Sequence, residues 1–177
     1  YTDNNVDLNY AANSDRDGLY DILIYNNSTI ANIINEHSEL SATSVQYYNA
    51  ETLEDVDVLF NIRKNNQEPE ATLEWIYNGG TWVGEWSSND YPISSWGVIG
   101  GSVNGGSCCT QSISILDQGH WLAQNIDWDN IPIGAGPTQF QRNITINDSE
   151  ASVIVSSYHN GYGELPLIVE KSYGNGT

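Results

Sequence analysis

The segment 13–21 carries residue types and a spacing that suit a calcium ion. Asn13, Asp15, Asp17 and Asp21 place oxygen-bearing side chains at its first, third, fifth and ninth positions, and a glycine at the sixth permits a tight turn. Calcium is held by several oxygen ligands that wrap around it, which this spacing can supply. The segment lacks a glutamate at its twelfth position, and an ordinary turn with solvated carboxylates is the alternative. The segment therefore predicts a calcium site, with calcium as the candidate cofactor.

Cys108 and Cys109 are the only cysteines, and they are adjacent. Adjacent residues cannot close a long loop, so in an oxidising compartment the pair predicts a vicinal disulfide or a disulfide to another chain. In a reducing compartment the two would be plain thiols. No His or Cys lies close enough in sequence to complete a metal site with them.

Five positions fit the acceptor pattern Asn-x-Ser/Thr for N-linked glycosylation. The asparagines are Asn26, Asn27, Asn143, Asn147 and Asn175. Chance matches are common in a chain with this much Asn, and glycans on adjacent asparagines would crowd each other. In an acidic, cysteine-poor chain, the set favours a glycosylated protein that is extracellular or at the cell surface.

The composition limits the partners. The 177 residues include 5 Lys and Arg against 23 Asp and Glu, which gives a formal net charge of -18. So few cations cannot form a basic surface, which argues against binding of nucleic acid or of an anionic membrane. No stretch approaches the roughly 20 apolar residues of a membrane span. Hydrophobic residues make up 39% of the chain, which is typical of a folded domain with its own core.

The elements that must position these residues alternate between strand and helix in the first half of the chain. Apolar runs and helical periodicity predict strands at 20–25, 44–48, 56–62 and 81–86, helices at 29–36 and 69–77, and one helical turn at 51–55. Asn27 or Ser28 is expected to cap the first helix. The side chains expected to face the core are Ile30, Ile33 and Ile34 in the first helix and Leu73, Ile76 and Tyr77 in the second.

The second half of the chain is expected to be mostly loops and strands. We expect a short helical piece at 94–99, strands at 113–116, 140–146, 152–157 and 165–171, and irregular structure at 119–138. The whole order predicts an α/β fold: a doubly wound, mostly parallel sheet with an antiparallel extension at one edge. Residues 1–19 would form an N-terminal arm and the Asp-rich loop, and 20–177 a single domain. With neither Met nor a signal peptide, the chain is expected to begin after processing or within a longer protein.

Five segments resemble the glutamine-amidotransferase-like superfamily, nearest to its trehalose-utilisation-type branch. They are 56–60, 73–84, 96–101, 119–122 and 166–176. The resemblance implies a flavodoxin-like α/β fold over most of the chain. Active members carry a Cys in the sharp turn after a strand and a His-Glu pair later, and this chain has neither at the matching positions. The resemblance therefore implies a scaffold without the reaction.

The turn after the strand at 81–86 supports this interpretation. In α/β folds such a turn is where a nucleophile is placed. Here it carries Gly84, Glu85, Trp86 and Ser87, and no Cys. We therefore predict a non-enzymatic extracellular domain that serves as a glycosylated subunit of a surface or filamentous assembly.

Two further features bear on partners. Flat aromatic rings stack on sugars, so Trp86, Trp96 and Trp121 support an alternative: a carbohydrate-binding or carbohydrate-modifying domain of the trehalose-utilisation type. Val6, Leu8 and Tyr10 alternate with polar residues in a short strand-like arm at 1–12. The arm predicts self-association into a homo-polymer, with the sheet edge of a neighbouring subunit as its receptor. Binding to other surface proteins, or an arm that folds back on its own domain, are the other possibilities.

Overall fold

The computed structural model describes residues 20–38, 40–62, 68–85, 99–100, 107–108, 110–124, 126–131, 140–141, 145–159 and 163–177. Backbone contacts divide the chain into two compact units. Unit 1 comprises 1–85 and 173–177, and unit 2 comprises 86–172. The two units are described separately below. The single domain expected over 20–177 stays a prediction.

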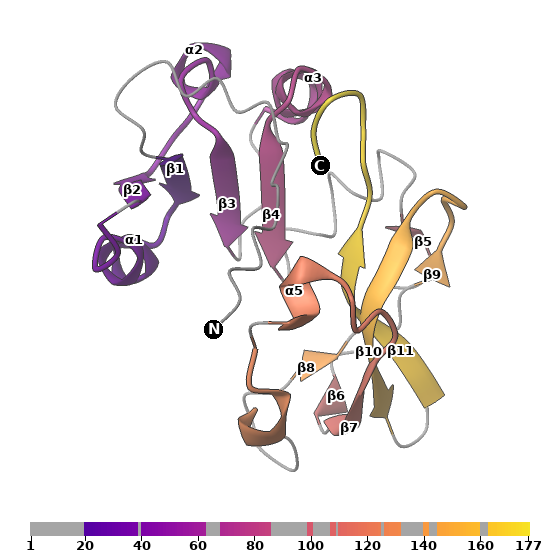
Figure 1. Ribbon diagram of the computed structural model, residues 1–177. Helices are drawn as coiled ribbons and strands as arrows, with labels where there is room; N and C mark the ends of the chain where they lie inside the picture. The colour runs from indigo at the N-terminus through magenta and orange to yellow at the C-terminus, as the bar shows by residue number, and fades with distance from the viewer. Residues whose placement is uncertain are drawn as a thin grey trace, which may run out of the picture. The chain divides into compact units, whose positions relative to one another are not determined.

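Unit 1 is built on a four-stranded parallel sheet (Figure 1). Its strands are β1 (Tyr20–Tyr25), β2 (Leu40–Val45), β3 (Val58–Ile62) and β4 (Thr81–Glu85), in the order β2-β1-β3-β4. All three neighbouring pairs run parallel, with Ile22 opposite Ala42 and Val58, and Leu59 opposite Trp82. Parallel neighbours need long crossover connections, and the helices of unit 1 supply them.

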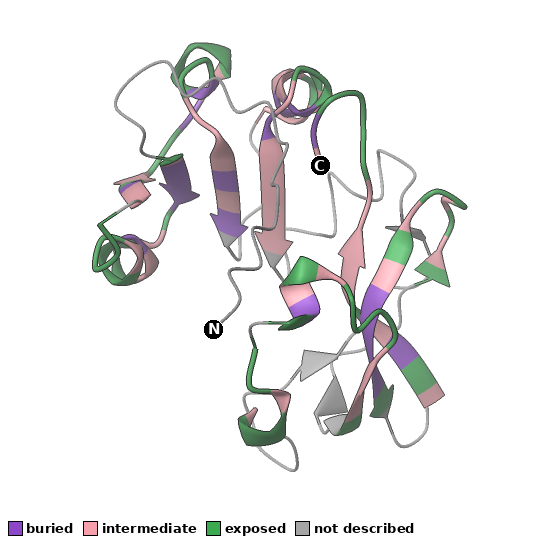
Figure 2. Ribbon diagram, viewed as in Figure 1, coloured by how far each residue is buried: buried purple, intermediate pink, exposed green. Residues whose placement is uncertain are grey.

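Helices cover both faces of this sheet. They are α1 (Ser28–Ile34), α2 (Ala50–Leu53) and α3 (Pro69–Tyr77). Successive side chains of a strand point to opposite faces, so β1 contributes to two separate apolar clusters. One cluster joins Ile22, Ile24 and Ala42 to Ala31 of α1. The other joins Leu23, Tyr25 and Leu59 to Tyr48, to Leu53 of α2 and to Trp75 of α3. Figure 2 shows buried stretches in β1 and β3, the two central strands of the sheet.

Side-chain caps set where the first two helices begin. The side-chain oxygen of Asn27 accepts a hydrogen bond from the backbone N–H of Ile30 at 3.1 Å, which confirms it as the cap of α1. Asn49 and Thr52 form a reciprocal capping box at the start of α2. α3 begins with Pro69, whose fixed backbone angle suits a first helical position.

Two core predictions for the helices are wrong. Ile33 is 55% exposed, because α1 buries the face formed by Ile30, Ala31 and Ile34 and leaves Ile33 at its margin. Tyr77 is equally exposed, and its ring packs edge-on against Tyr173 instead.

The predicted strand at 44–48 lies four residues too late. The observed strand β2 spans Leu40–Val45, and Tyr48 follows it as a fully buried side chain of the core. The side chain of Asn35 holds β2 in place: it donates to the carbonyl of Ala42 and accepts from the N–H of Ala42, both at 2.8 Å. This pairing of a side chain with a strand edge leaves no periodic pattern in the sequence.

Unit 2 is built on antiparallel pairs. Its main sheet has the order β11-β10-β7. Its strands are β7 (Thr110–Ile115), β10 (Ser152–His159) and β11 (Gly163–Glu170). Two smaller pairs accompany it: β5 (Ile99–Gly100) pairs with β9 (Thr145–Ile146), and β6 (Ser107–Cys108) pairs with β8 (Phe140–Gln141). In the part of the chain that the structure describes, the antiparallel strands thus form separate sheets, and the expected extension of the parallel sheet is wrong.

The predictions from sequence differ from the structure in other parts of unit 2 as well. The strand expected at 140–146 is two short strands, β8 and β9, that pair with different partners. The region 119–138 contains α5 (Trp121–Gln124) and the 3-10 helix η2 (Trp128–Asn130). The helical piece expected at 94–99 lies outside the described residues except for Ile99, which is in β5.

Among the described residues, Trp75 in unit 1 and Trp128 in unit 2 each donate an indole N–H to a backbone carbonyl. In unit 1, Trp75 donates to Val56 at 3.1 Å and packs against the core. In unit 2, Trp128 donates to Ala123 at 2.8 Å and packs against a small cluster around Ile154. Both rings are therefore fixed at two points, by packing and by a hydrogen bond.

No helix within the described ranges combines the length and apolarity that crossing a bilayer requires.

Candidate functional site

The most organised group of ionisable and aromatic side chains in the described part of unit 2 surrounds His120. The residue lies at the start of α5, after a turn in which the Asp117 carboxylate accepts from the N–H of Gly119 at 3.0 Å. The partner of its ring, Glu170, is the last residue of β11. The pair thus joins the beginning of a short helix to the end of a long strand.

Both ring nitrogens of His120 are engaged. Nδ1 accepts a hydrogen bond from the backbone N–H of Leu122 at 3.3 Å, so it carries no proton in this arrangement. Nε2 then bears the proton and donates to the Glu170 carboxylate at 2.8 Å. The two side chains are only 14% and 21% exposed. The hydrogen bonds therefore assign the tautomer of the ring and fix its orientation.

The two hydrogen bonds of His120 suit a structural role better than the role of a general base. A histidine that takes a proton from a substrate needs one ring nitrogen free to face it, while the other is oriented by a carboxylate. His120 has the carboxylate, but its second nitrogen caps α5. The geometry therefore ties α5 to β11.

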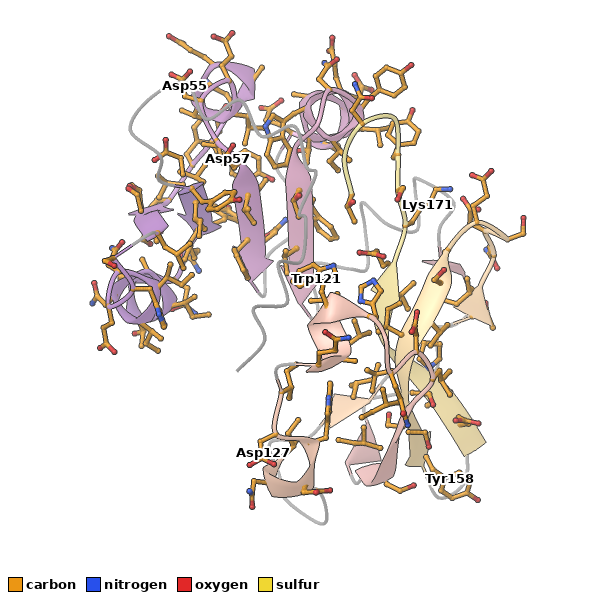
Figure 3. The ribbon with its side chains drawn as sticks, in the orientation of Figure 1. Asp55, Asp57, Trp121, Asp127, Tyr158 and Lys171 are labelled. Atoms are coloured by element: carbon orange, nitrogen blue, oxygen red, sulfur yellow. The ribbon has the colours of Figure 1, made fainter. Side chains whose placement is uncertain are left out.

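Trp121, which follows His120 in the sequence, is a partly exposed aromatic side chain. It is 48% exposed, and its ring centroid lies 5.9 Å from that of His120 at an interplanar angle of 31°. Figure 3 shows Trp121 on the first turn of α5. Because His120 is held by Glu170, the neighbouring indole stands next to a fixed ring. A flat, partly exposed indole can stack on a sugar ring or another planar group.

The predicted calcium ligands are only partly described. Asn13, Asp15 and Asp17 lie outside the described residues. Asp21 lies in β1, where its carbonyl accepts from the N–H of Asp57 at 2.9 Å and its N–H donates to the Asp57 carboxylate at 2.9 Å. Among the described residues, no group of three or more His, Cys, Asp and Glu side chains is arranged to hold a metal ion. The calcium site stays a prediction.

The predicted glycosylation sites differ in their surroundings. Asn26, Asn147 and Asn175 are exposed and lie outside the strands and helices. Asn27 is only partly exposed, and its side-chain oxygen is used as the cap of α1. Asn143 lies outside the described residues. Three of the four acceptor asparagines that the structure describes are therefore exposed to solvent.

Most of the other predicted residues lie outside the described part of the chain. Cys108 belongs to β6, while Cys109 lies outside the described residues, so the disulfide stays a prediction. The arm residues Val6, Leu8 and Tyr10 and the aromatic residues Trp86 and Trp96 also lie outside them. Trp121 is thus the one member of the predicted sugar-stacking group within the described residues.

Sequence reasoning missed two polar groups. The pair of His120 and Glu170 joins residues fifty positions apart, and no local motif marks it. Lys171, the one Lys or Arg within the described ranges, contacts the carboxylates of Asp148 at 2.7 Å and Glu150 at 3.1 Å. A lone cation next to an acidic turn was a weak signal for this second group.

Comparison with family models, with curated proteins and with solved structures gives no match for the chain. The resemblance to amidotransferase-like proteins therefore stays a prediction.

Proposed function

We propose that the chain is a non-catalytic, glycosylated interaction domain of an extracellular or cell-surface assembly. The observation that carries the proposal is the exposure of the sequon residues Asn26, Asn147 and Asn175, all outside the strands and helices. An oligosaccharide at any of the three can reach solvent without disturbing a strand or helix. The engagement of both nitrogens of His120 supports the non-catalytic part, because it leaves this histidine without a nitrogen to act on a substrate.

The fold that goes with this function is, in our proposal, the doubly wound flavodoxin-like fold of amidotransferase-like proteins. Its support is the strand order β2-β1-β3-β4, with α1 on one face of the sheet and α2 and α3 on the other. In such a sheet, ligands bind at the carboxyl ends of the strands where the strand order reverses. The structure places a fully buried polar residue, Asn61, near that end of β3.

Secretion from a glycosylating host tests the proposal. The intact mass should exceed that of the bare sequence, and removal of N-linked glycans should restore it. Ser149→Ala should remove the glycan at Asn147 alone, and Thr29→Ala should change the mass little, because Asn27 is engaged in a helix cap. A mass equal to that of the bare sequence would overturn the glycoprotein proposal.

The non-catalytic part has its own test. Glutaminase and hydrolase assays should show no turnover that depends on Cys108 or Cys109, because neither lies at the turn where this fold places a nucleophile. Turnover that is lost in Cys108→Ser or Cys109→Ser would overturn it.

Carbohydrate binding is the second candidate function, and the exposed ring of Trp121 favours it. Stacking of a sugar would change tryptophan fluorescence and would be lost in Trp121→Ala. Tyr158→Ala is the matched control, because Tyr158 is exposed to a similar degree on β10 of the same unit. Titration with soluble glucans that shows no change, or an equal loss in both variants, would count against this candidate.

Calcium binding and self-association complete the proposal. Calcium held by Asn13, Asp15, Asp17 and Asp21 should raise the melting temperature by mass action, and Asp15→Ala should cancel the rise. Deletion of residues 1–12 should abolish any polymer while leaving the fold intact. Calorimetry with millimolar calcium and sedimentation of the truncated chain check the two points.

A further inference from the structure

One tight turn of unit 1 lies against the end of α3. The N–H of Tyr173 donates to the carbonyl of Gly176 at 2.8 Å, and the N–H of Gly176 donates back to Tyr173 at 3.1 Å. Gly174, the first of the two central residues, has a φ of 63°, which is the pattern of a type II′ hairpin turn. The N–H of Asn175, the second central residue, donates to the carbonyl of Tyr77 at 2.9 Å. The turn is therefore closed on itself and hydrogen-bonded to the last residue of α3.

The two glycines of this turn permit its close approach to Tyr77. A Cβ atom added at Gly174 would collide with the carbonyl and with the ring of Tyr77. A Cβ atom added at Gly176 would collide with backbone carbonyls at the end of α3 and just after it. The approach thus depends on glycine at both positions. Asn175, which lies between the two glycines, is exposed.

Two exposed aromatic side chains belong to residues next to Asn175. Tyr173 lies two positions before it, and Tyr77 accepts its backbone N–H. The two rings pack edge to face, with their centroids 5.5 Å apart and an interplanar angle of 66°. Tyr77 is nevertheless 55% exposed and Tyr173 40% exposed. These two residues, the tyrosine pair, therefore support each other and still present aromatic surface to solvent.

Asn175 is also the acceptor residue of the sequon Asn175-Gly176-Thr177. An N-linked glycan is bonded to the side-chain nitrogen of asparagine, so its first sugar ring stays close to the backbone of that residue. A tethered group meets a neighbouring surface at a high effective concentration. The C–H face of a sugar ring can pack on a flat aromatic ring, as in other aromatic contacts. The first sugar on Asn175 thus has the tyrosine pair within its reach.

The other described sequons lack this combination. Tyr25 lies within two positions of Asn26 and Asn27, but its ring is only 6% exposed and belongs to the core. No aromatic residue lies within two positions of Asn147. Asn175 is therefore the described acceptor that has an exposed aromatic residue two positions away.

We propose that the first sugar of a glycan on Asn175 packs against the tyrosine pair, so that this glycan stabilises unit 1. The inference rests on the proposed function in one respect, that the chain is N-glycosylated. It extends that function by naming the acceptor whose glycan has a binding surface and the two residues that form the surface.

A single-sequon chain, in which only Asn175 can be glycosylated, tests the inference. The chain is secreted from a yeast host, whose N-linked glycans begin with N-acetylglucosamine, and an endoglycosidase trims its glycan to that one sugar. The same chain with Asn175→Gln is the bare reference. The single sugar should raise the melting temperature by about 2–4 °C, the rise expected of one aromatic contact in a chain of this size. The other acceptor sites are removed by Ser28→Ala, Thr29→Ala, Thr145→Ala and Ser149→Ala.

Variants of the tyrosine pair show whether this rise depends on the rings. Tyr173→Ala should lose most of the rise, which is taken as the difference between sugar-bearing and bare forms so that the cost of the substitution itself cancels. Tyr173→Phe keeps the flat ring and should keep the rise. Tyr47→Ala is the matched control and should also keep it, because Tyr47 is 56% exposed in the same unit but contacts Glu68, just before the start of α3.

Nuclear magnetic resonance of the trimmed single-sequon chain gives a second readout that does not depend on stability. Sugar protons that lie over a tyrosine ring should shift upfield and show nuclear Overhauser contacts to the ring protons of Tyr77 or Tyr173. Unshifted sugar resonances, or an equal rise in melting temperature in Tyr173→Ala and Tyr47→Ala, would overturn the inference and leave the glycoprotein proposal intact. A wild-type chain that carries glycans at other sites but none at Asn175 would do the same. A wild-type chain with no glycan at any site would overturn both.

Discussion

The two units of this chain stabilise their sheets in different ways. In unit 1 the parallel sheet has helices on both faces, and apolar side chains from β1 fill two clusters at once. In unit 2 the described core is a small cluster around Ile154 and Val155, and polar side-chain pairs supplement it. Ser156 of β10 is buried and donates to Glu164 at 2.5 Å, and His120 is fastened to Glu170. Apolar clusters on both faces thus dominate the described core of unit 1, where Asn35 adds a polar contact to β2, whereas unit 2 combines a smaller cluster with polar pairs.

Truncation of the cores should give the largest effect and the clearest contrast. Leu59→Ala removes a fully buried side chain from the centre of unit 1 and should cost about 4–5 kcal/mol, because the packed surroundings cannot collapse into the cavity. Ile154→Ala in unit 2 should cost about 2–3 kcal/mol, because its smaller cluster can relax. Urea unfolding measures both.

Leu167→Ala is the control for these two substitutions, because Leu167 is exposed on β11, and it should cost under about 1 kcal/mol. An equal loss in the Leu59 and Ile154 variants would remove the energetic contrast between the two units.

Loss of the hydrogen bond between His120 and Glu170 in unit 2 should give the next largest effect. His120→Ala removes the cap of α5 and leaves the Glu170 carboxylate without its imidazole donor, which should cost about 1–3 kcal/mol. Hydrogen exchange should show faster opening of α5 and of the end of β11. His37→Ala, on an exposed histidine of unit 1, should change stability by less than about 0.5 kcal/mol. A similar loss of stability in the two variants would show that the hydrogen bonds of His120 do not stabilise unit 2.

A glycine comparison tests the backbone of unit 1. Gly79 ends the turn after α3 with a φ of 125°, where a side chain is strained even though space is open around it. Gly79→Ala should cost about 1 kcal/mol, measured by thermal unfolding. Gly119→Ala in unit 2 is the control, because Gly119 has no positive φ and a Cβ there would meet only the Asp117 carboxylate at 3.4 Å. A smaller loss at Gly79 than at Gly119 would contradict this explanation.

The smallest effect should come from the acidic turn of unit 2. The hydrogen bond from Lys171, followed by that from the Glu150 N–H, lowers the pKa of Asp148 below its ordinary value of 3.8. A carboxyl whose pKa is lower in the folded state stabilises that state above the unfolded pKa. This contribution disappears as pH falls through the folded pKa. The melting temperature of Asp148→Asn should therefore lie slightly below that of the wild type near neutral pH, and the two should converge below pH 3.8. A difference that stays constant across this range would exclude the ion pair as its cause.

The parts of unit 1 that sequence predicted best are those in which local pattern and tertiary packing agree. The strand Tyr20–Tyr25 and the helix Pro69–Tyr77 have the predicted bounds, since an apolar run and a proline at the first helical position mark them. Strand β2 was misplaced because Tyr48, outside the strand, is the more buried and apolar residue. Local apolarity alone cannot separate a strand from a loop whose side chain enters the core.

In unit 2 and in the candidate site, less could be predicted. The stretch 140–146 was predicted as one strand, yet β8 and β9 pair with partners on different segments, which only tertiary contacts decide. Trp121 was identified from its residue type, whereas His120 and Glu170 meet through the fold and share no local spacing. Hydrogen bonds between distant side chains carry no periodic signal, so the chemistry of the site had to come from the structure.

The fixed indoles of Trp75 and Trp128 give each unit an optical reporter of its own. Each ring packs against the core of its own unit, so loss of packing in that unit would shift its emission toward the red. A chain that keeps only Trp75 or only Trp128, with the other five tryptophans replaced by phenylalanine, would follow the unfolding of one unit. Whether the units melt together or in sequence then becomes a question of two emission curves.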